Sequence, residues 1–164
     1  MAGKRAAGLW GKWVNQAADL RVLIVEDQAI LAMELELVLG DAGCEVVGCA
    51  MDRDGAFEIA ARERPTLALV DVNLLDGMTG PQIAQRLVSE YGTVVVFLTA
   101  NPEQIPDGFA GALGAVCKPF DDHTIRAVVA FAGRFITDRT VGEAPRKFRL
   151  APWLKTPPTG IPTC

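Results

Sequence analysis

Four apolar segments of the chain are each followed by polar residues that could bind a phosphoryl group or a metal ion. These residues are Glu26 and Asp27, then Asp71, Thr99 and Lys118. Clustered carboxylates repel one another, and a hard divalent cation such as Mg²⁺ relieves that repulsion with oxygen ligands. With a metal and Lys118 offsetting the charge, Asp71 could attack phosphorus and form an aspartyl phosphate. The Thr99 hydroxyl would then help to hold the phosphoryl oxygens, so the pattern predicts phosphoryl chemistry on Asp71.

Five short apolar runs, mostly rich in Val, Leu and Ile, must position these residues. They cover residues 21–25, 44–49, 66–70, 93–98 and 114–117. Their length and composition are typical of buried strands in a parallel sheet. Because ligands gather outside the carboxyl ends of such strands, we expect the polar residues at one edge of the sheet.

Longer stretches separate the runs and are suited to crossover helices. Amphipathic segments cover residues 28–39, 54–64, 79–91 and 122–136. Residues 101–113 carry two prolines and two glycines, which predicts a short or irregular helix. Since parallel strands need crossover connections, the alternation predicts a doubly wound α/β domain with a five-stranded parallel sheet.

Charge divides the chain into three parts. Residues 21–138 hold 18 acidic and 8 basic residues, whereas the extension 1–20 and the tail 139–164 are both net positive. The acidic body argues against a nucleic-acid-binding face. In the extension, Trp10 and Trp13 begin a helical spacing that could form a short helix. The basic tail holds five of the ten prolines and is too short for a second domain, so we expect an extension.

Length and composition narrow the class of protein. The 164 residues are 50% apolar and suit one compact domain with short ends. No apolar stretch approaches the roughly 18 residues that a membrane span requires. The four cysteines have neither metal-ligand spacing nor the density of a disulfide scaffold, so a cytoplasmic protein is expected.

The ordered motifs resemble the receiver domain of bacterial two-component response regulators. The segments that carry the resemblance are Val22-Leu-Ile-Val-Glu26-Asp27, Leu69-Val70-Asp71, Phe97-Leu98-Thr99-Ala100 and Cys117-Lys118-Pro119-Phe120. The resemblance covers residues 21–136 and implies the flavodoxin-like receiver fold. It also implies that a sensor histidine kinase phosphorylates Asp71.

The resemblance assigns a role to each polar residue. Asp27, Asp71 and the backbone carbonyl of Asn73 would bind Mg²⁺ directly, and Glu26 would act largely through water. Thr99 would contact the phosphoryl group and Lys118 would pair with it. The peptide bond that precedes Pro119 would be cis, as is usual in the family.

Two positions affect how such a domain would transmit its phosphorylation state to a partner protein. The position three before Lys118, which usually bears Tyr or Phe, is Ala115. The usual aromatic readout cannot operate there, so coupling through the fourth helix and fifth strand would need another side chain or a backbone shift. Asn101, followed by Pro102 and Glu103, resembles receivers of the alphaproteobacterial general stress pathway.

The leading hypothesis is a stand-alone receiver that is a phosphorylation switch rather than an enzyme, although it would assist its own phosphorylation and dephosphorylation. It would signal to a downstream regulator through protein contacts, or drain phosphate from a kinase in a shared phosphorelay. An alternative is a pseudo-receiver that binds partners independently of phosphorylation. A haloacid-dehalogenase-like phosphatase is disfavoured because Asn73 stands where that family has a second, proton-donating Asp.

Overall fold

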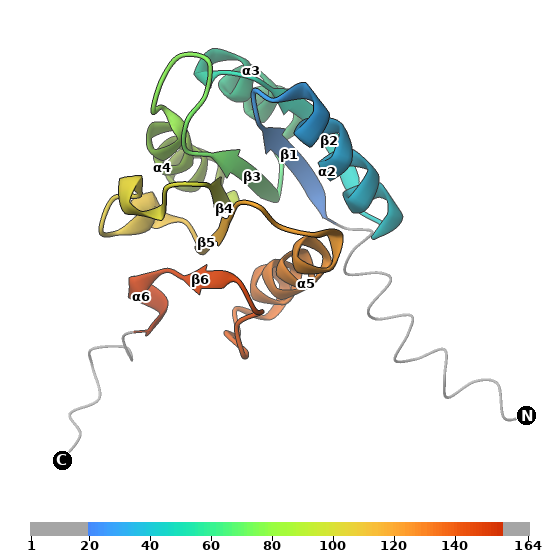
Figure 1. The fold of residues 1–164 in the computed structure, drawn as a ribbon, viewed down its shortest axis with the longest axis vertical. Coiled ribbons are helices and arrows are strands. Elements are labelled where there is room, and N and C mark those ends of the chain that lie inside the picture. The colour runs from blue at the N-terminus through green and yellow to red at the C-terminus, as the bar shows by residue number, and fades with distance from the viewer. Residues whose placement is uncertain (1–19, 156–164) are drawn as a thin grey trace, which may run out of the picture.

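The computed structural model describes residues 20–155, which form a central sheet covered by helices (Figure 1). The strands lie in the order β2-β1-β3-β4-β5-β6. Their bounds are β1 (Arg21–Val25), β2 (Glu45–Ala50), β3 (Leu67–Asp71), β4 (Val94–Thr99), β5 (Gly114–Cys117) and β6 (Phe148–Leu150). All neighbours from β2 to β5 pair in parallel. The five predicted parallel strands are therefore confirmed, and the sixth was not predicted.

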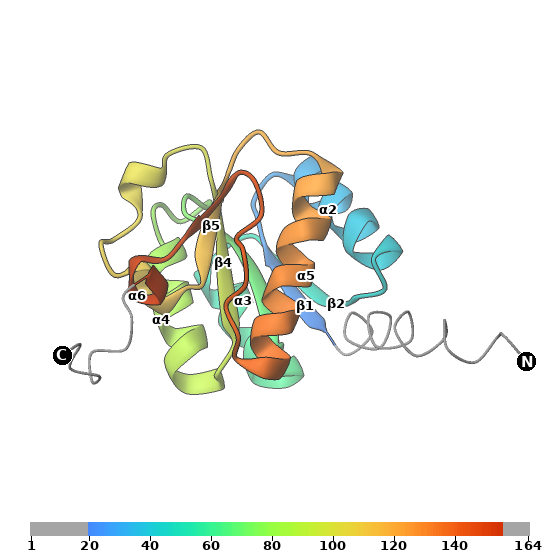
Figure 2. The ribbon, with the colours of Figure 1, turned by 90° about the horizontal axis from the view of Figure 1, so that it is seen from below.

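Helices cover both faces of the sheet, as the doubly wound prediction requires (Figure 2). Their bounds are α2 (Ala29–Asp41), α3 (Arg53–Glu63), α4 (Gly80–Tyr91), α5 (Asp122–Asp138) and α6 (Pro152–Lys155). In β1, Val22 and Ile24 face the core shared with α2 and α5, whereas Leu23 and Val25 face the core shared with α3 and α4. This alternation follows from the two-residue period of a strand. None of the helices within residues 20–155 has the length and apolar composition needed to cross a membrane.

Local signals set where several helices begin and end. The Asp52 carboxylate accepts a hydrogen bond from the Gly55 amide at 2.8 Å and caps α3. Asp121 does the same for α5 through the Thr124 amide, also at 2.8 Å. These bonds satisfy amide groups that have no partner within the helix. The α4 helix ends at Gly92, whose φ of 64° is a left-handed conformation that glycine adopts without strain.

The connection between β4 and β5 contains no α-helix. Two short 3₁₀ turns, η1 (Pro102–Gln104) and η2 (Phe109–Gly111), replace it, and the buried side chains of Ile105 and Phe109 anchor them. Proline lacks the amide donor that a continuing helix needs, which explains the irregular path that the sequence indicated. The connection between β4 and β5 is thus irregular, as the prediction for residues 101–113 indicated.

The C-terminal part of the described chain contains a strand and a short helix that the sequence analysis did not predict within the basic extension. Strand β6 pairs antiparallel with β5, and α6 follows it directly, so this segment closes one edge of the sheet (Figure 1). Phe148, Leu150 and Ala151 supply apolar side chains on either side of the exposed Arg149. Three apolar residues beside one charge gave too short a pattern to predict a strand from sequence. The helix predicted around Trp10 and Trp13 lies outside the described residues.

Candidate functional site

The carboxyl ends of four neighbouring strands bring the predicted residues to one edge of the sheet. Glu26 and Asp27 directly follow β1, Asp71 ends β3 and Thr99 ends β4. Lys118 directly follows β5, whose residue Cys117 is paired with Thr99. The parallel register of β1, β3, β4 and β5 thus places the residues of these strand ends together, as the sequence pattern predicted.

Three carboxylates form the centre of this site. Glu26, Asp27 and Asp71 each offer an oxygen atom within 4.8 Å of the others. Glu26 and Asp71 are buried, whereas Asp27 is partly exposed. Buried carboxylates this close together need positive charge nearby. The oxygen-only donor set suits a hard cation such as Mg²⁺, so the residues present fit the predicted metal.

Lys118 supplies a positive charge next to Glu26 and Asp71. Its Nζ lies 2.8 Å from Glu26 Oε2 and 2.7 Å from Asp71 Oδ2. Burial on its own lowers the pKa of Lys118, but its hydrogen bonds to Asp71 and Glu26 outweigh burial, and the pKa is raised. The ammonium is therefore firmly protonated. The Lys118–Pro119 peptide bond is cis, as the resemblance implied.

Backbone amides hold the second oxygen of each buried carboxylate. Glu26 Oε1 accepts a hydrogen bond from the Gln28 amide at 3.0 Å, and Asp71 Oδ1 accepts one from the Asn73 amide at 3.1 Å. Burial raises the pKa of Glu26, while Lys118 and the Gln28 amide oppose that shift. Both carboxylates are therefore fixed in orientation, with one oxygen on Lys118 and the other on the main chain.

Thr99 is the buried last residue of β4, and it follows Leu98, which is paired with Asp71 of β3. Its Oγ1 accepts a hydrogen bond from the Asn101 amide at 2.9 Å, and its carbonyl oxygen accepts one from the Lys118 amide at 2.8 Å. Asn101 itself is exposed and lines the pocket that contains Asp27, Asp71 and Lys118. The main-chain hydrogen bond between Lys118 and Thr99 thus connects the residue that carries the ammonium to the residue that carries the hydroxyl.

Gln104 is a site neighbour that the sequence analysis missed. Its Oε1 accepts a hydrogen bond from the Asn73 side-chain amide at 2.7 Å, which ties the η1 turn to the loop after β3. Nothing in the local sequence around Gln104 marks it, because the contact exists only once the β4–β5 connection has folded back toward β3.

Ala115 is buried in the middle of β5. Its strand neighbours are Phe97 on β4 and Arg149 on β6. The Arg149 guanidinium lies 5.7 Å from the centre of the Phe109 ring in η2. Strand β6 therefore lies beside Ala115.

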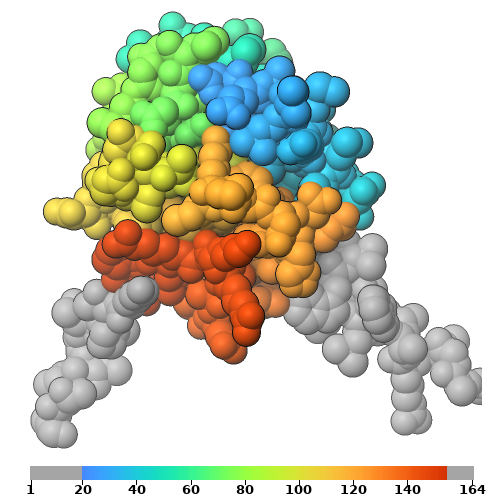
Figure 3. Space-filling view, in the orientation of Figure 1, coloured from blue at the N-terminus to red at the C-terminus, as the bar shows by residue number. Residues whose placement is uncertain are grey.

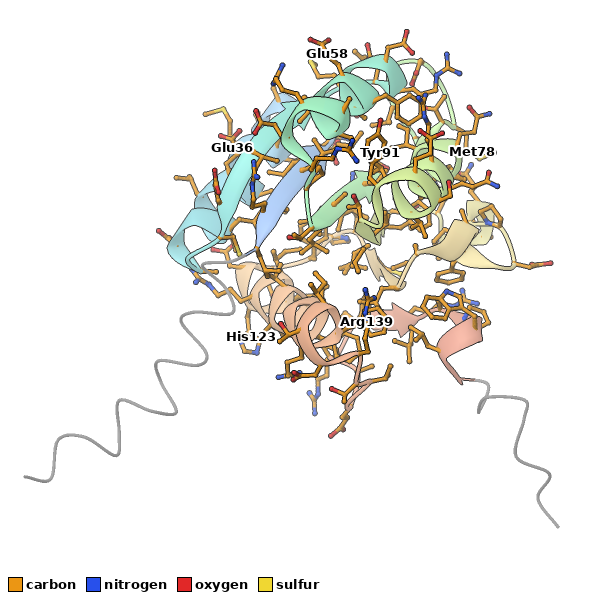
Figure 4. The ribbon with its side chains drawn as sticks, turned by 180° about the vertical axis from the view of Figure 1, so that it is seen from behind. Glu36, Glu58, Met78, Tyr91, His123 and Arg139 are labelled. Atoms are coloured by element: carbon orange, nitrogen blue, oxygen red, sulfur yellow. The ribbon has the colours of Figure 1, made fainter. Side chains whose placement is uncertain are left out.

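Other titratable residues lie away from this edge. His123, the only histidine, is exposed near the start of α5, and Glu36 and Glu58 are exposed on α2 and α3 (Figure 4). Glu36 Oε1 accepts a hydrogen bond from Cys49 Sγ at 2.8 Å. Burial, with this carboxylate beside the thiol, raises the pKa of Cys49 to about 12. Cys49 is therefore a protonated thiol, and none of these groups joins the carboxylate site.

Comparison with known proteins agrees with this geometry. A family described as "Response regulator receiver domain" matches residues 22–130. The regulator PhyR of Methylorubrum extorquens is 35% identical over 120 residues, which are 71% of this chain and 45% of that protein. The transcriptional regulatory protein PdtaR of Mycobacterium tuberculosis is 34% identical over 127 residues, or 74% of this chain and 60% of that protein. The match thus spans about half the length of these curated relatives.

Solved structures show the same fold. The receiver domain of Erythrobacter litoralis PhyR superimposes with a TM-score of 0.66 at 31% identity, covering 75% of this chain and 96% of that one. The response regulator PhyR from Brucella abortus gives a TM-score of 0.60 at 26% identity, covering 77% of this chain and 53% of that one.

Proposed function

This chain belongs to the response regulator receiver domain family, and on that premise we propose that it is a phosphorylation switch whose acceptor is Asp71. A sensor histidine kinase would supply the phosphoryl group. The observation that carries the proposal is the buried Asp71 carboxylate at the end of β3, 2.7 Å from the Lys118 ammonium and beside two further carboxylates.

The residues around Asp71 suit phosphoryl transfer. One Asp71 oxygen forms a bond to phosphorus while the bond between phosphorus and the kinase histidine nitrogen breaks, and the histidine leaves with that electron pair. Lys118 Nζ then pairs with a phosphoryl oxygen in place of the carboxylate oxygen, and the Thr99 hydroxyl donates a hydrogen bond to another. Both groups are already fixed at this edge before transfer, which favours the reaction through positioning.

Mg²⁺ fits the remaining part of the site. Asp27, Asp71 and the Asn73 carbonyl would hold it, with Glu26 acting through water. When bound, the ion would supply positive charge for the incoming phosphoryl oxygens. Three carboxylates and one ammonium leave two net negative charges at the site, which a divalent cation neutralises.

The direct test is chemical phosphorylation of the purified chain. Acetyl phosphate with Mg²⁺ should add one phosphoryl group, detected by intact mass, and peptide mapping should place it on Asp71. The Asp71→Asn variant should gain none, because an amide is a poor nucleophile. Asp107→Asn, which changes an exposed carboxylate away from the site, should be labelled like the wild type. Undiminished labelling of Asp71→Asn would refute the assignment.

The use made of the phosphoryl group is a separate part of the proposal. Signalling through protein contacts and draining phosphate from a shared kinase both require Asp71. A kinase charged with radioactive phosphate and mixed with this chain and a second regulator distinguishes them. A sink lowers the labelling of the second regulator, whereas a signal carrier leaves it unchanged and binds its target more tightly once phosphorylated.

Ala115 keeps the pseudo-receiver alternative open to experiment, since the aromatic side chain usual at that position is absent. A pseudo-receiver would bind its partner equally with and without acetyl phosphate treatment. A switch would show different affinities, and Asp71→Asn would lock it in the unphosphorylated affinity.

A further inference from the structure

The outer edge of β5 is occupied by a segment from the C-terminal part of the same chain. We name it the β6–α6 segment, residues 148–155. Phe148, Arg149 and Leu150 pair with the three β5 residues Val116, Ala115 and Gly114, in that order. Beyond the strand, the Ala151 amide donates to the Leu113 carbonyl at 3.0 Å, and Trp153 Nε1 donates to the Ala112 carbonyl at 2.9 Å. The main chain of residues 112–116 is therefore covered along this whole edge.

Two aromatic side chains anchor the segment to different depths. Phe148 is only 7% exposed and meets the Phe131 ring of α5 edge-on, with 5.4 Å between ring centres. Trp153 is 44% exposed and lies 6.3 Å from the Phe135 ring. The segment forms a continuous surface feature beside α5 (red in Figure 3). The segment is short, and its buried side chains are Phe148 and Ala151. Short edge units of this kind can open locally, at a fraction of the global unfolding free energy.

Gly114 shows that the β5 edge is shaped for an aromatic residue on the incoming strand. A Cβ atom added to Gly114 would lie 2.4 Å from Phe148 Cζ and 2.5 Å from the Arg149 carbonyl oxygen. The three heavy atoms nearest to that Cβ all belong to Phe148 or Arg149. The backbone of Gly114 does not adopt a left-handed φ, so glycine is needed there for the close approach of β6. The absence of a side chain at Gly114 thus leaves a slot at the β5 edge, and the Phe148 ring packs there against the main chain.

Charge complements this shape. Arg146 and Lys147 directly precede the strand and Arg149 lies within it, and Lys147 Nζ lies 4.0 Å from Asp121 Oδ2. Within residues 21–138 acidic residues outnumber basic ones by 18 to 8. A basic segment therefore approaches this domain with favourable long-range electrostatics.

We propose that the β5 edge is a strand-accepting interaction surface for a partner protein, and that the β6–α6 segment occupies it in cis. The partner offers an extended basic segment that pairs antiparallel with β5 and places an aromatic side chain against Gly114. The recognition is β-strand addition, in which main-chain bonds give affinity and a side-chain slot gives specificity. This deepens the proposed function by naming a contact surface, and its tests use no phosphate, so the two proposals fail separately.

The first test measures whether the edge can release its own occupant. In full-length Gly114→Ala the added methyl group should expel β6, and hydrogen exchange at the amides of residues 149–151 should become at least tenfold faster. The amides of β1 and β3 should keep their protection. Gly108→Ala is the matched control, because a Cβ there meets nothing within 4 Å. Unchanged protection of residues 149–151 in Gly114→Ala would overturn the proposal.

The second test asks whether the edge accepts a strand in trans. A fluorescent peptide of residues 144–155 is titrated into the full-length double variant Phe148→Ser, Trp153→Ser, whose own segment is weakened while the edge is intact. Anisotropy should show binding at least tenfold tighter than to the wild type. Adding Gly114→Ala to the double variant, or using a peptide with Phe148→Ser, should abolish the binding.

Two results contradict the proposal in this second test. One is equal peptide affinity for the wild type and the double variant, which means that the peptide binds elsewhere. The other is no binding to the double variant while its β1 and β3 amides remain protected, which means that a folded, vacated edge does not accept a strand. If the double variant loses that protection, the exchange result for Gly114→Ala decides the proposal alone.

Discussion

Lys118 determines the electrostatic balance of the site at the residue scale. It is a single ammonium that bonds to two buried carboxylates 92 and 47 positions away in the chain. Its side chain is 16% exposed, so solvent screens these pairs only weakly. Without it, Glu26 and Asp71 would be two neighbouring buried charges with no protein cation between them.

We therefore predict that Lys118→Met destabilises the protein by about 3 kcal/mol at neutral pH, because it leaves buried carboxylates unpaired. Burial already raises the pKa of Glu26, and loss of Lys118 removes the largest interaction that opposes this shift and leaves only the Gln28 amide. A carboxyl group with a raised folded-state pKa binds protons more tightly when folded, so its relative stabilisation is present at low pH and lost as the pH rises through that pKa. The deficit of Lys118→Met should therefore shrink on acidification, measured by urea unfolding without Mg²⁺.

Lys147→Met is the control for this variant. Lys147 is 56% exposed and lies 4.0 Å from an exposed carboxylate, so its loss should change the free energy of unfolding by less than about 0.5 kcal/mol. A Lys118→Met deficit as small as this, or one independent of pH, would contradict the role given to Lys118.

At the scale of elements, the start of α4 is pressed against the end of β3. A Cβ atom on Gly80 would lie 2.3 Å from the Asp71 carbonyl oxygen and 2.6 Å from Val72 Cα. The Gly80 amide also donates to the Val72 carbonyl at 3.1 Å. This close approach sets the path of the chain that leaves Asp71, so a glycine in α4 helps to position the Asp71 carboxylate.

We predict opposite effects for two helix glycines changed to alanine. Gly80→Ala should lower the free energy of unfolding by about 1–3 kcal/mol, because the methyl group overlaps main-chain atoms of β3 and the residue after it, and these can move only if the backbone shifts. Gly40→Ala, near the end of α2, meets nothing within 4 Å and should raise it by about 0.5 kcal/mol through the better helix propensity of alanine. Thermal or urea unfolding measures the stability of both variants. An unchanged free energy of unfolding in Gly80→Ala would mean that α4 is free to move away from β3.

At the scale of the whole molecule, the sheet gathers distant segments so that their charges meet at one edge. Unfolding separates Asp71 from Glu26 and Asp27, so a cation that binds all three carboxylates binds the folded state preferentially. Such binding stabilises a protein in proportion to the logarithm of ligand concentration above its Kd. Global stability is thus a test of metal binding at the three carboxylates that does not depend on phosphorylation.

Mg²⁺ should therefore stabilise the wild type against urea, by about 1.4 kcal/mol at ten times its Kd. Asp27→Asn, which removes one partly exposed carboxylate from the cluster, should weaken this dependence, and removal of the ion with a chelator should reverse it in the wild type. Asp54→Asn changes an exposed carboxylate elsewhere and should behave as the wild type. Equal Mg²⁺ dependence in Asp27→Asn would show that the ion binds at another place.

Much of the molecule follows from local pattern. The apolar runs and the stretches between them predict five parallel strands with crossover connections, and every crossover returns the chain so that strand ends meet at one edge. That is why the positions of Glu26, Asp71, Thr99 and Lys118 could be predicted together. The weak helix signal of residues 101–113 likewise reflects a local cause, the prolines that interrupt it.

Only the tertiary structure decided the rest, because the responsible contacts join residues that are far apart in the chain. Gln104 reaches Asn73 across 31 positions, and Phe148 packs on Gly114 across a helix and a loop. The β6–α6 segment has too few apolar residues to signal a strand by itself, and it becomes one because β5 presents unpaired main-chain groups beside a slot for its aromatic ring. The sequence by itself determined which residues gather at the edge of the sheet; packing determined how their charges pair and what covers the strand beside them.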